Sequence, residues 1–167
     1  MKSPLNLLFL CTGNSCRSII AEALANHLGA GRLRAHSAGS HPTGEVHPRA
    51  LAVLASHGVP VTAPSSKSMD DLEGRHFDAV ITVCDAAAGE ACPIWLARTC
   101  KSHWGLPDPA AASGSDERID AAFEATYQSL EARIQSLLAL DLETLNPLGL
   151  TAHLRKIHQR HAERSPA

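Results

Sequence analysis

The sequence has few aromatic residues, no long apolar run and no strong net charge. Aromatic residues make up 4% of the 167 residues, so an aromatic ligand would find few ring walls. No apolar stretch approaches the ~20 residues that a membrane-spanning helix needs. The formal net charge of −2 predicts no general affinity for nucleic acid or for an anionic membrane. No repeat or low-complexity segment interrupts the chain, whose length predicts one compact domain.

The sequence also lacks a secretory signature. Residues 1–4 lead directly into an apolar segment and carry no small-residue cleavage site. The five cysteines are an odd number, which argues against the disulfide framework of a secreted domain. We therefore expect a cytoplasmic protein whose cysteines carry chemistry.

Strand-like and helix-like patterns alternate along the chain. Residues 5–10 form a nearly continuous apolar run, typical of a strand covered on both faces in a parallel sheet. The alternation predicts an α/β fold with helices on both faces of that sheet. The expected strands are residues 5–10, 33–39, 77–84 and 99–104, and the expected helices are residues 18–28, 48–57, 69–72 and 115–138.

The most informative stretch is Cys11-Thr12-Gly13-Asn14-Ser15-Cys16-Arg17-Ser18, between the first strand and the first helix. A turn in this place can aim backbone N–H groups at an anion, at the positive end of the helix dipole. Arg17 can hold a tetrahedral oxyanion through two parallel hydrogen bonds. The same field is expected to lower the pKa of Cys11 and to keep it as a nucleophilic thiolate. The alternative is a cysteine that merely ends a buried strand, but the whole stretch in register favours a working site.

Three further residues of the stretch have expected roles. Asn14 suits a left-handed backbone position. Ser18 is expected to donate a hydrogen bond to the Cys11 thiolate and to lower its pKa further. Cys16 is expected to pack beneath the loop without a redox role.

The pattern Cys-x5-Arg-Ser after the first strand resembles the low-molecular-weight protein tyrosine phosphatase family. Thr12 and the later cysteines make the sequence more similar to the thioredoxin-coupled arsenate reductases built on that fold. The resemblance covers roughly residues 5–138 and implies a four-stranded parallel sheet in the order 2-1-3-4. It also implies a domain over residues 1–140, followed by a short helical extension over residues 141–167 to which we assign no function.

Asp108 is the candidate proton donor. It follows an expected strand in Leu106-Pro107-Asp108-Pro109, and the carboxyl ends of parallel strands meet at the edge where ligands bind. The flanking prolines stiffen the loop and fix the direction of the carboxylate. An Asp-Pro pair can also be a plain turn, but Asp108 matches the general acid position of the family.

Two cysteines discriminate between a reductase and a phosphatase. A phosphatase hydrolyses its thiophosphate intermediate with water, whereas a reductase needs a second thiol to attack the first. Cys84 ends the third expected strand, at the same edge as Cys11, and Cys92 follows seven small or polar residues that can rearrange at low cost. The resemblance implies a relay from Cys11–Cys84 to Cys84–Cys92 by thiol–disulfide exchange. Cys100 is the reserve candidate for the resolving thiol.

The resemblance also points to an ion site behind the loop. Some reductases of the family hold a potassium ion with residues that match Asn14, Glu22 and Ser37. The aspartate expected near Ser68 is missing here, so we hypothesise that the ammonium of Lys67 replaces the ion. The histidines of the extension, which come without an acidic or thiol partner, are more typical of a solvated basic tail than of a metal site.

The expected reaction is the reduction of arsenate to arsenite, without a metal or organic cofactor. Thioredoxin or glutaredoxin would supply the electrons, and phosphate or sulfate would bind as analogues. The first alternative is a low-molecular-weight tyrosine phosphatase, which usually has an aromatic residue where this chain has Ala110. The second is a non-catalytic oxyanion-binding module, which would need neither Asp108 nor the pair of Cys84 and Cys92.

Overall fold

The computed structural model describes residues 4–61, 63–84 and 99–164, so Cys92 lies outside the described residues. Strands and helices alternate over this part of the chain, as the sequence predicts. In chain order the elements are β1 (Leu5–Leu10), α1 (Arg17–Leu28), β2 (Leu33–Ala38), α2 (Pro48–Ser56), the 3-10 helix η1 (Met69–Leu72), β3 (Ala79–Thr82), β4 (Cys100–His103), the 3-10 helix η3 (Pro109–Ala111), α4 (Asp116–Leu138), the 3-10 helix η4 (Leu142–Thr144) and α5 (Pro147–Arg164).

The four strands form one parallel sheet in the order β2-β1-β3-β4, which confirms the order implied by the resemblance. Leu7, Leu8 and Phe9 of β1 are fully buried, because this central strand is covered on both faces. β3 is shorter than expected and ends at Thr82, so Cys84 lies just beyond its carboxyl end.

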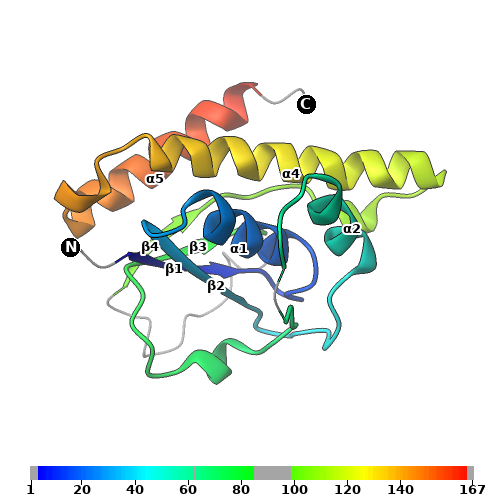
Figure 1. Cartoon of the computed structure of the whole chain (residues 1–167), viewed down its shortest axis with the longest axis horizontal. Coiled ribbons are helices and arrows are strands. Elements are labelled where there is room, and N and C mark those ends of the chain that lie inside the picture. Colours follow the sequence, from blue (N-terminus) through cyan, green and yellow to red (C-terminus); the bar gives the residue numbers. More distant parts are fainter. Residues whose placement is uncertain (1–3, 62, 85–98, 165–167) are drawn as a thin grey trace.

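The four α-helices pack against one face of the sheet (Figure 1). There α4 contacts α1, α2 and α5, and α5 also lies along β4. The opposite face carries a smaller cluster in which Leu72 of η1 and Phe77 pack on Leu8 and Val80. In the described part of the chain, that face is therefore covered by a 3-10 helix and loops.

Two helices begin at capped ends that the sequence provides. Pro48 occupies the first turn of α2, and the His47 ring nitrogen Nδ1 accepts a hydrogen bond from the Arg49 N–H at 3.1 Å. The hydroxyl of Ser115 caps α4, and two acidic residues follow in its first turn, where the helix dipole favours negative charge.

The C-terminal helix α5 is part of the main core. Leu150, Leu154 and Ile157 are buried there together with residues of the sheet and of α4. The Trp104 indole N–H donates a hydrogen bond to the Leu154 carbonyl at 3.0 Å, which fixes α5 against the end of β4. A separate domain boundary near residue 140 stays a prediction.

None of the helices in the described residues combines the length and the apolar character needed to cross a bilayer.

Candidate active site

The stretch over residues 11–18, which we call the binding loop, connects the carboxyl end of β1 to the first turn of α1. Asn14 has φ of 48°, so the left-handed position expected for it is confirmed. No side chain caps the N-terminus of α1, so no capping side chain occupies the N–H groups of its first turn. These groups and the positive end of the helix dipole make the loop suitable for an anion.

The segment over residues 39–47 holds the binding loop in place by donating hydrogen bonds to the carbonyl groups of the loop. The backbone N–H groups of His41, Thr43 and His47 donate to the carbonyls of Thr12, Gly13 and Ser15, at 2.9, 3.0 and 3.0 Å respectively. These three contacts hold the loop through its carbonyls and occupy none of its own N–H groups. Sequence reasoning did not identify this segment, because its contacts are made by backbone atoms.

Asn14 braces the loop from its buried side. Its Oδ1 accepts a hydrogen bond from the Lys67 N–H at 2.9 Å, and its Nδ2 donates to the Ser18 hydroxyl at 2.8 Å. Both Asn14 and Ser18 are fully buried. The Ser18 hydroxyl is the acceptor in this pair, and the expected donation of its own proton to the Cys11 thiolate stays a prediction.

Gly39 is a site-forming residue that the sequence analysis missed. A Cβ placed on it would collide with the Thr12 carbonyl and would lie 2.8 Å from the Cys11 carbonyl. Only glycine allows the end of β2 to approach the binding loop this closely. The available signal was a glycine directly after a strand, but a close contact with a distant loop cannot be inferred from that alone.

The side chain of Arg17 joins the binding loop to the loop over residues 105–109, which we call the acid loop. Its Nη1 donates to the Leu106 carbonyl at 2.8 Å, and its Nη2 lies 3.8 Å from Oδ2 of Asp108. Among the described residues, Arg17 Nε is the buried side-chain polar atom that has no hydrogen-bond partner. A buried N–H donor without a partner is costly, and an oxyanion would satisfy it.

Asp108 lies at the N-terminus of η3. One carboxylate oxygen accepts a hydrogen bond from the Ala110 N–H at 3.0 Å, and the other faces Arg17. With 44% of its side chain exposed, the carboxylate can exchange protons with solvent. This geometry brings Asp108 to the same edge as Arg17, and its role as proton donor stays a prediction.

Cys11 and Cys84 form a buried pair of thiols. The Cys84 thiol lies close enough to act on Cys11, and the Thr12 N–H donates to the Cys84 sulfur at 3.4 Å. The interaction with Cys84, together with burial, raises the pKa of Cys11. Arg17 and the Gly13 N–H act in the opposite direction but are outweighed. The expectation of a lowered Cys11 pKa was therefore wrong for the thiol pair, because it considered only the loop and ignored the neighbouring thiol.

The other cysteines occupy different environments. Cys16 is buried beneath the loop, as expected, and burial raises the pKa of its thiol. Cys100 begins β4 and donates to the Pro147 carbonyl at 3.3 Å. The strand register places Cys100 beside Ala79, about 10 Å before the carboxyl end of β3. A disulfide needs Cα atoms within about 7 Å, so Cys100 cannot reach Cys84 in this arrangement.

The residues of the expected ion site are grouped behind the loop. The Ser37 hydroxyl donates to Glu22 at 2.9 Å. Burial raises the pKa of Glu22, and the positive charge of Lys67 opposes part of this effect. The Lys67 ammonium donates to the Ser65 carbonyl at 3.1 Å. No cluster of potential metal ligands occurs in the described residues. Replacement of an ion by Lys67 stays a prediction.

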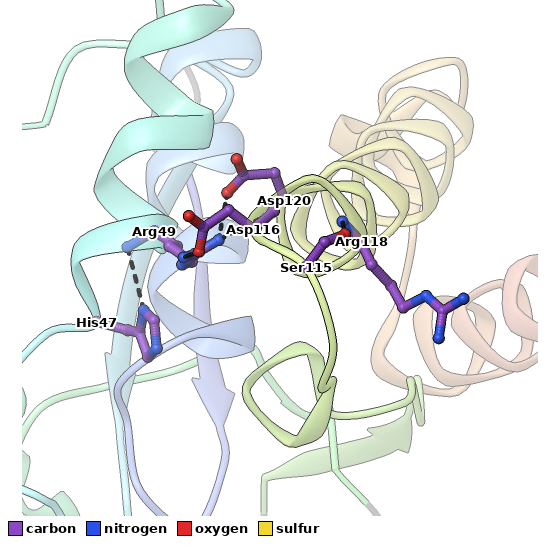
Figure 2. A network of polar contacts seen from close by, with 6 residues as sticks. All are labelled: His47, Arg49, Ser115, Asp116, Arg118 and Asp120. Carbon is purple, nitrogen blue, oxygen red and sulfur yellow. Dashed lines mark hydrogen bonds and ion pairs between the residues drawn. The ribbon is translucent and has the colours of Figure 1, made fainter.

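A network of ion pairs fixes the start of α2, and with it the outer support of the loop. Figure 2 shows the Arg49 guanidinium between two carboxylates of α4, those of Asp116 at 2.8 Å and Asp120 at 2.7 Å. His47 caps the same turn of α2 and holds the Ser15 carbonyl through its backbone. The network thus links α4 to the binding loop through α2.

The fold is of the α/β class, and the site is a loop that contains a cysteine and an arginine and is suited to binding an oxyanion. The family model described as "Low molecular weight phosphotyrosine protein phosphatase" matches residues 6–147. The chain therefore belongs to this family, and its curated relatives within the family include arsenate reductases.

One such relative is the arsenate reductase of Bacillus licheniformis, which is 36% identical over 134 residues and covers 80% of this chain and 94% of the relative. A solved arsenate reductase in its phosphate-binding state has a TM-score of 0.68 at 29% identity, covering 81% of this chain and 97% of that chain. A thioredoxin-dependent arsenate reductase from Corynebacterium glutamicum has a TM-score of 0.57 at 29% identity, covering 83% of this chain and 64% of that chain.

Proposed function

We propose that this protein is an arsenate reductase that converts arsenate to arsenite through a relay of three cysteines. The observation that carries the proposal is the position of Cys84 beside Cys11 and the binding loop, where its sulfur accepts a hydrogen bond from the Thr12 N–H. A phosphatase needs only the first of these thiols, because water releases its phosphate. A second thiol in contact with the first is what a two-electron reduction requires.

The binding loop and Arg17 are proposed to hold three oxygens of arsenate. The first-turn N–H groups of α1 and the unpartnered Arg17 Nε supply donors that are already in place. Phosphate and sulfate are tetrahedral oxyanions of similar size, so both are expected to bind as analogues. The phosphate-binding state of the solved relative supports this expectation.

In the first step the Cys11 thiolate attacks arsenic, and an S–As bond replaces one As–O bond. Arg17 and the Gly13 N–H stabilise the Cys11 thiolate and so oppose the effects of Cys84 and of burial, which raise the pKa of Cys11. Asp108 gives a proton to the departing hydroxide, which leaves as water. The 3.8 Å separation of Asp108 from Arg17 supports this role, because Arg17 is proposed to hold the oxygens of arsenate.

In the second step the Cys84 sulfur attacks the Cys11 sulfur. The S–As electron pair passes to arsenic, which leaves as arsenite after taking up the proton of Cys84, and a Cys11–Cys84 disulfide remains. In the third step the Cys92 thiolate attacks Cys84 and releases Cys11 as a thiolate. The position of Cys100 at the opposite end of β4 favours Cys92 as the resolving thiol.

A thiol–disulfide oxidoreductase then reduces the Cys84–Cys92 disulfide, and thioredoxin is the donor used by one structural relative. We place the reaction in the cytoplasm, where thiols are kept reduced. The phosphatase alternative is disfavoured by Ala110, which offers no aromatic wall beside Asp108. A non-catalytic binding module would not require Asp108 to face Arg17.

The experiment is a measurement of arsenite release with thioredoxin, thioredoxin reductase and NADPH. Wild type is compared with Cys84→Ser, Cys92→Ser and, as a matched control, Cys100→Ser. We expect turnover by wild type and Cys100→Ser and none by the other two variants. Normal turnover by Cys84→Ser would overturn the proposal, whereas phosphate ester hydrolysis without arsenite release would establish the phosphatase alternative. Replacing thioredoxin by glutaredoxin and glutathione identifies the electron donor.

A further inference from the structure

A cavity of about 730 Å³ lies between the acid loop, α4 and α5. Its lining includes Leu106, Ala122, Ala125, Arg133, His158 and Ala162. We call it the α4–α5 pocket. Its volume is within the range of pockets that hold small organic molecules, and its small alanine side chains leave the space open. It shares the acid loop with the active site but includes no residue of the binding loop.

One charged group in the lining of this pocket is buried and has no acidic partner among the described residues. Arg133 is 2% exposed. Its Nε and Nη2 both contact Nδ1 of His158 at 3.3 Å, and its Nη1 donates to the Ser129 carbonyl at 3.0 Å. A carbonyl oxygen and an unprotonated ring nitrogen are neutral acceptors. Burial lowers the pKa of Arg133, and no carboxylate of the described residues opposes that effect. A buried cation with neutral partners is unfavourable, and an anion in the pocket would stabilise it.

The pocket depends on the C-terminal helix. His158 and Ala162 belong to α5, whereas the match to the family ends at residue 147. Figure 1 shows α5 lying alongside α4, and the two helices contact each other. One wall of the pocket is therefore built by a part of this chain that the family pattern does not include.

We propose that the α4–α5 pocket binds a small organic carboxylate, with its charged group at Arg133 and its apolar body against the alanines. Asp108 also lines the pocket, but its carboxylate faces Arg17 and the Ala110 N–H. Repulsion from Asp108 therefore places the anionic group at the Arg133 end. A bound molecule would contact the acid loop and limit its motion. This inference does not rest on the reductase mechanism.

The test uses 3-phenylpropionate as the probe and 3-phenylpropanamide as its neutral counterpart, with the full chain labelled for amide NMR. Phosphate is present at a saturating concentration, so that the binding loop is occupied. We expect 3-phenylpropionate to shift the amides of Ala122 and Ala125 and the Arg133 Nε–H signal, with an affinity at least about tenfold above that of the amide. Equal affinity of the two probes, or displacement of the probe by phosphate, would overturn the proposal.

Three variants complete the test. Arg133→Met removes the charge and is expected to abolish the preference for the carboxylate, whereas Arg118→Met, on the exposed surface of the same helix, should leave it unchanged. If Arg133→Met does not fold, Ala125→Phe replaces it, because Ala125 is exposed at the rim and a phenyl ring would fill the pocket. Unchanged binding to Ala125→Phe would show that the probe binds elsewhere and would reject the pocket.

Discussion

The thiols of Cys11 and Cys84 lie close together and interact, although one follows β1 and the other follows β3. Parallel strands make this meeting possible, because the carboxyl ends of β1 and β3 lie side by side in the sheet. The contact joins the nucleophile of an oxyanion site to a second reducing group. It also changes the acid–base behaviour of the nucleophile, and this leads to the first prediction.

Replacing Cys84 by alanine should lower the pKa of Cys11. In the wild type the contact with Cys84 is the largest cause that raises this pKa, while Arg17 and the Gly13 N–H lower it. Without Cys84 the thiolate fraction of Cys11 at neutral pH therefore increases. We expect Cys11 of Cys84→Ala to react with iodoacetamide at least about tenfold faster at pH 7, equivalent to one pKa unit. Peptide mass spectrometry over a pH series measures the rate, and Cys100→Ala should not change it.

Replacing Arg17 by lysine should weaken the binding of phosphate. Lysine keeps the positive charge but loses the planar fork, including the Nε donor that has no partner in the described residues. We expect a loss of about 2 kcal/mol, or roughly 30-fold in Kd, by titration calorimetry. Arg34→Lys, on the exposed face of β2, is the control. An unchanged phosphate affinity for Arg17→Lys would show that Arg17 does not hold the oxyanion.

Replacing Asp108 by asparagine should separate catalysis from binding. The amide cannot donate a proton to the departing hydroxide, so kcat for arsenite formation should fall at least about 100-fold. Phosphate should bind at least as tightly as to the wild type, because a negative charge facing Arg17 is removed. Steady-state kinetics and calorimetry measure the two effects, with Asp71→Asn on exposed η1 as the control. A normal kcat would remove Asp108 from the mechanism.

Replacing Gly39 by alanine should distort the binding loop and destabilise the fold. The added methyl group would collide with the Thr12 carbonyl, so the loop must shift. We expect a loss of about 1–3 kcal/mol in the free energy of unfolding, together with weaker phosphate binding. Gly74→Ala is the matched control, because Gly74 has φ of 89° and open space around it. Its cost of about 1 kcal/mol comes from backbone strain alone, and phosphate affinity should not change.

Most of the strands and helices could be predicted from hydrophobic periodicity. The run over residues 5–10 became a central buried strand, and the helices α2 and α4 begin at Pro48 and directly after Ser115, close to where the sequence predicts them. Strand order came from the resemblance, because periodicity shows which residues are buried and not which strands are neighbours. β3 is shorter than its apolar run, because a strand ends where its ladder partners end.

Less of the site than of the fold could be predicted from the sequence. The binding loop, Arg17 and Asp108 were found from local patterns, since residue type and spacing define an oxyanion loop. The raised pKa of Cys11 and the close approach of Gly39 were not, because both depend on distances between segments far apart in the sequence. The buried Arg133 was missed for the same reason: on the sequence it occupies one position of an amphipathic helix.

The most direct test of the central claim is a single turnover by Cys92→Ser with one equivalent of arsenate and no external thiol. The variant retains Cys11 and Cys84 but cannot pass the disulfide onward. The expected result is one equivalent of arsenite and a Cys11–Cys84 disulfide, identified by peptide mass spectrometry, with Cys16 and Cys100 still free. Recovery of unchanged arsenate with all thiols free, or arsenite together with a disulfide that omits Cys84, would contradict the account.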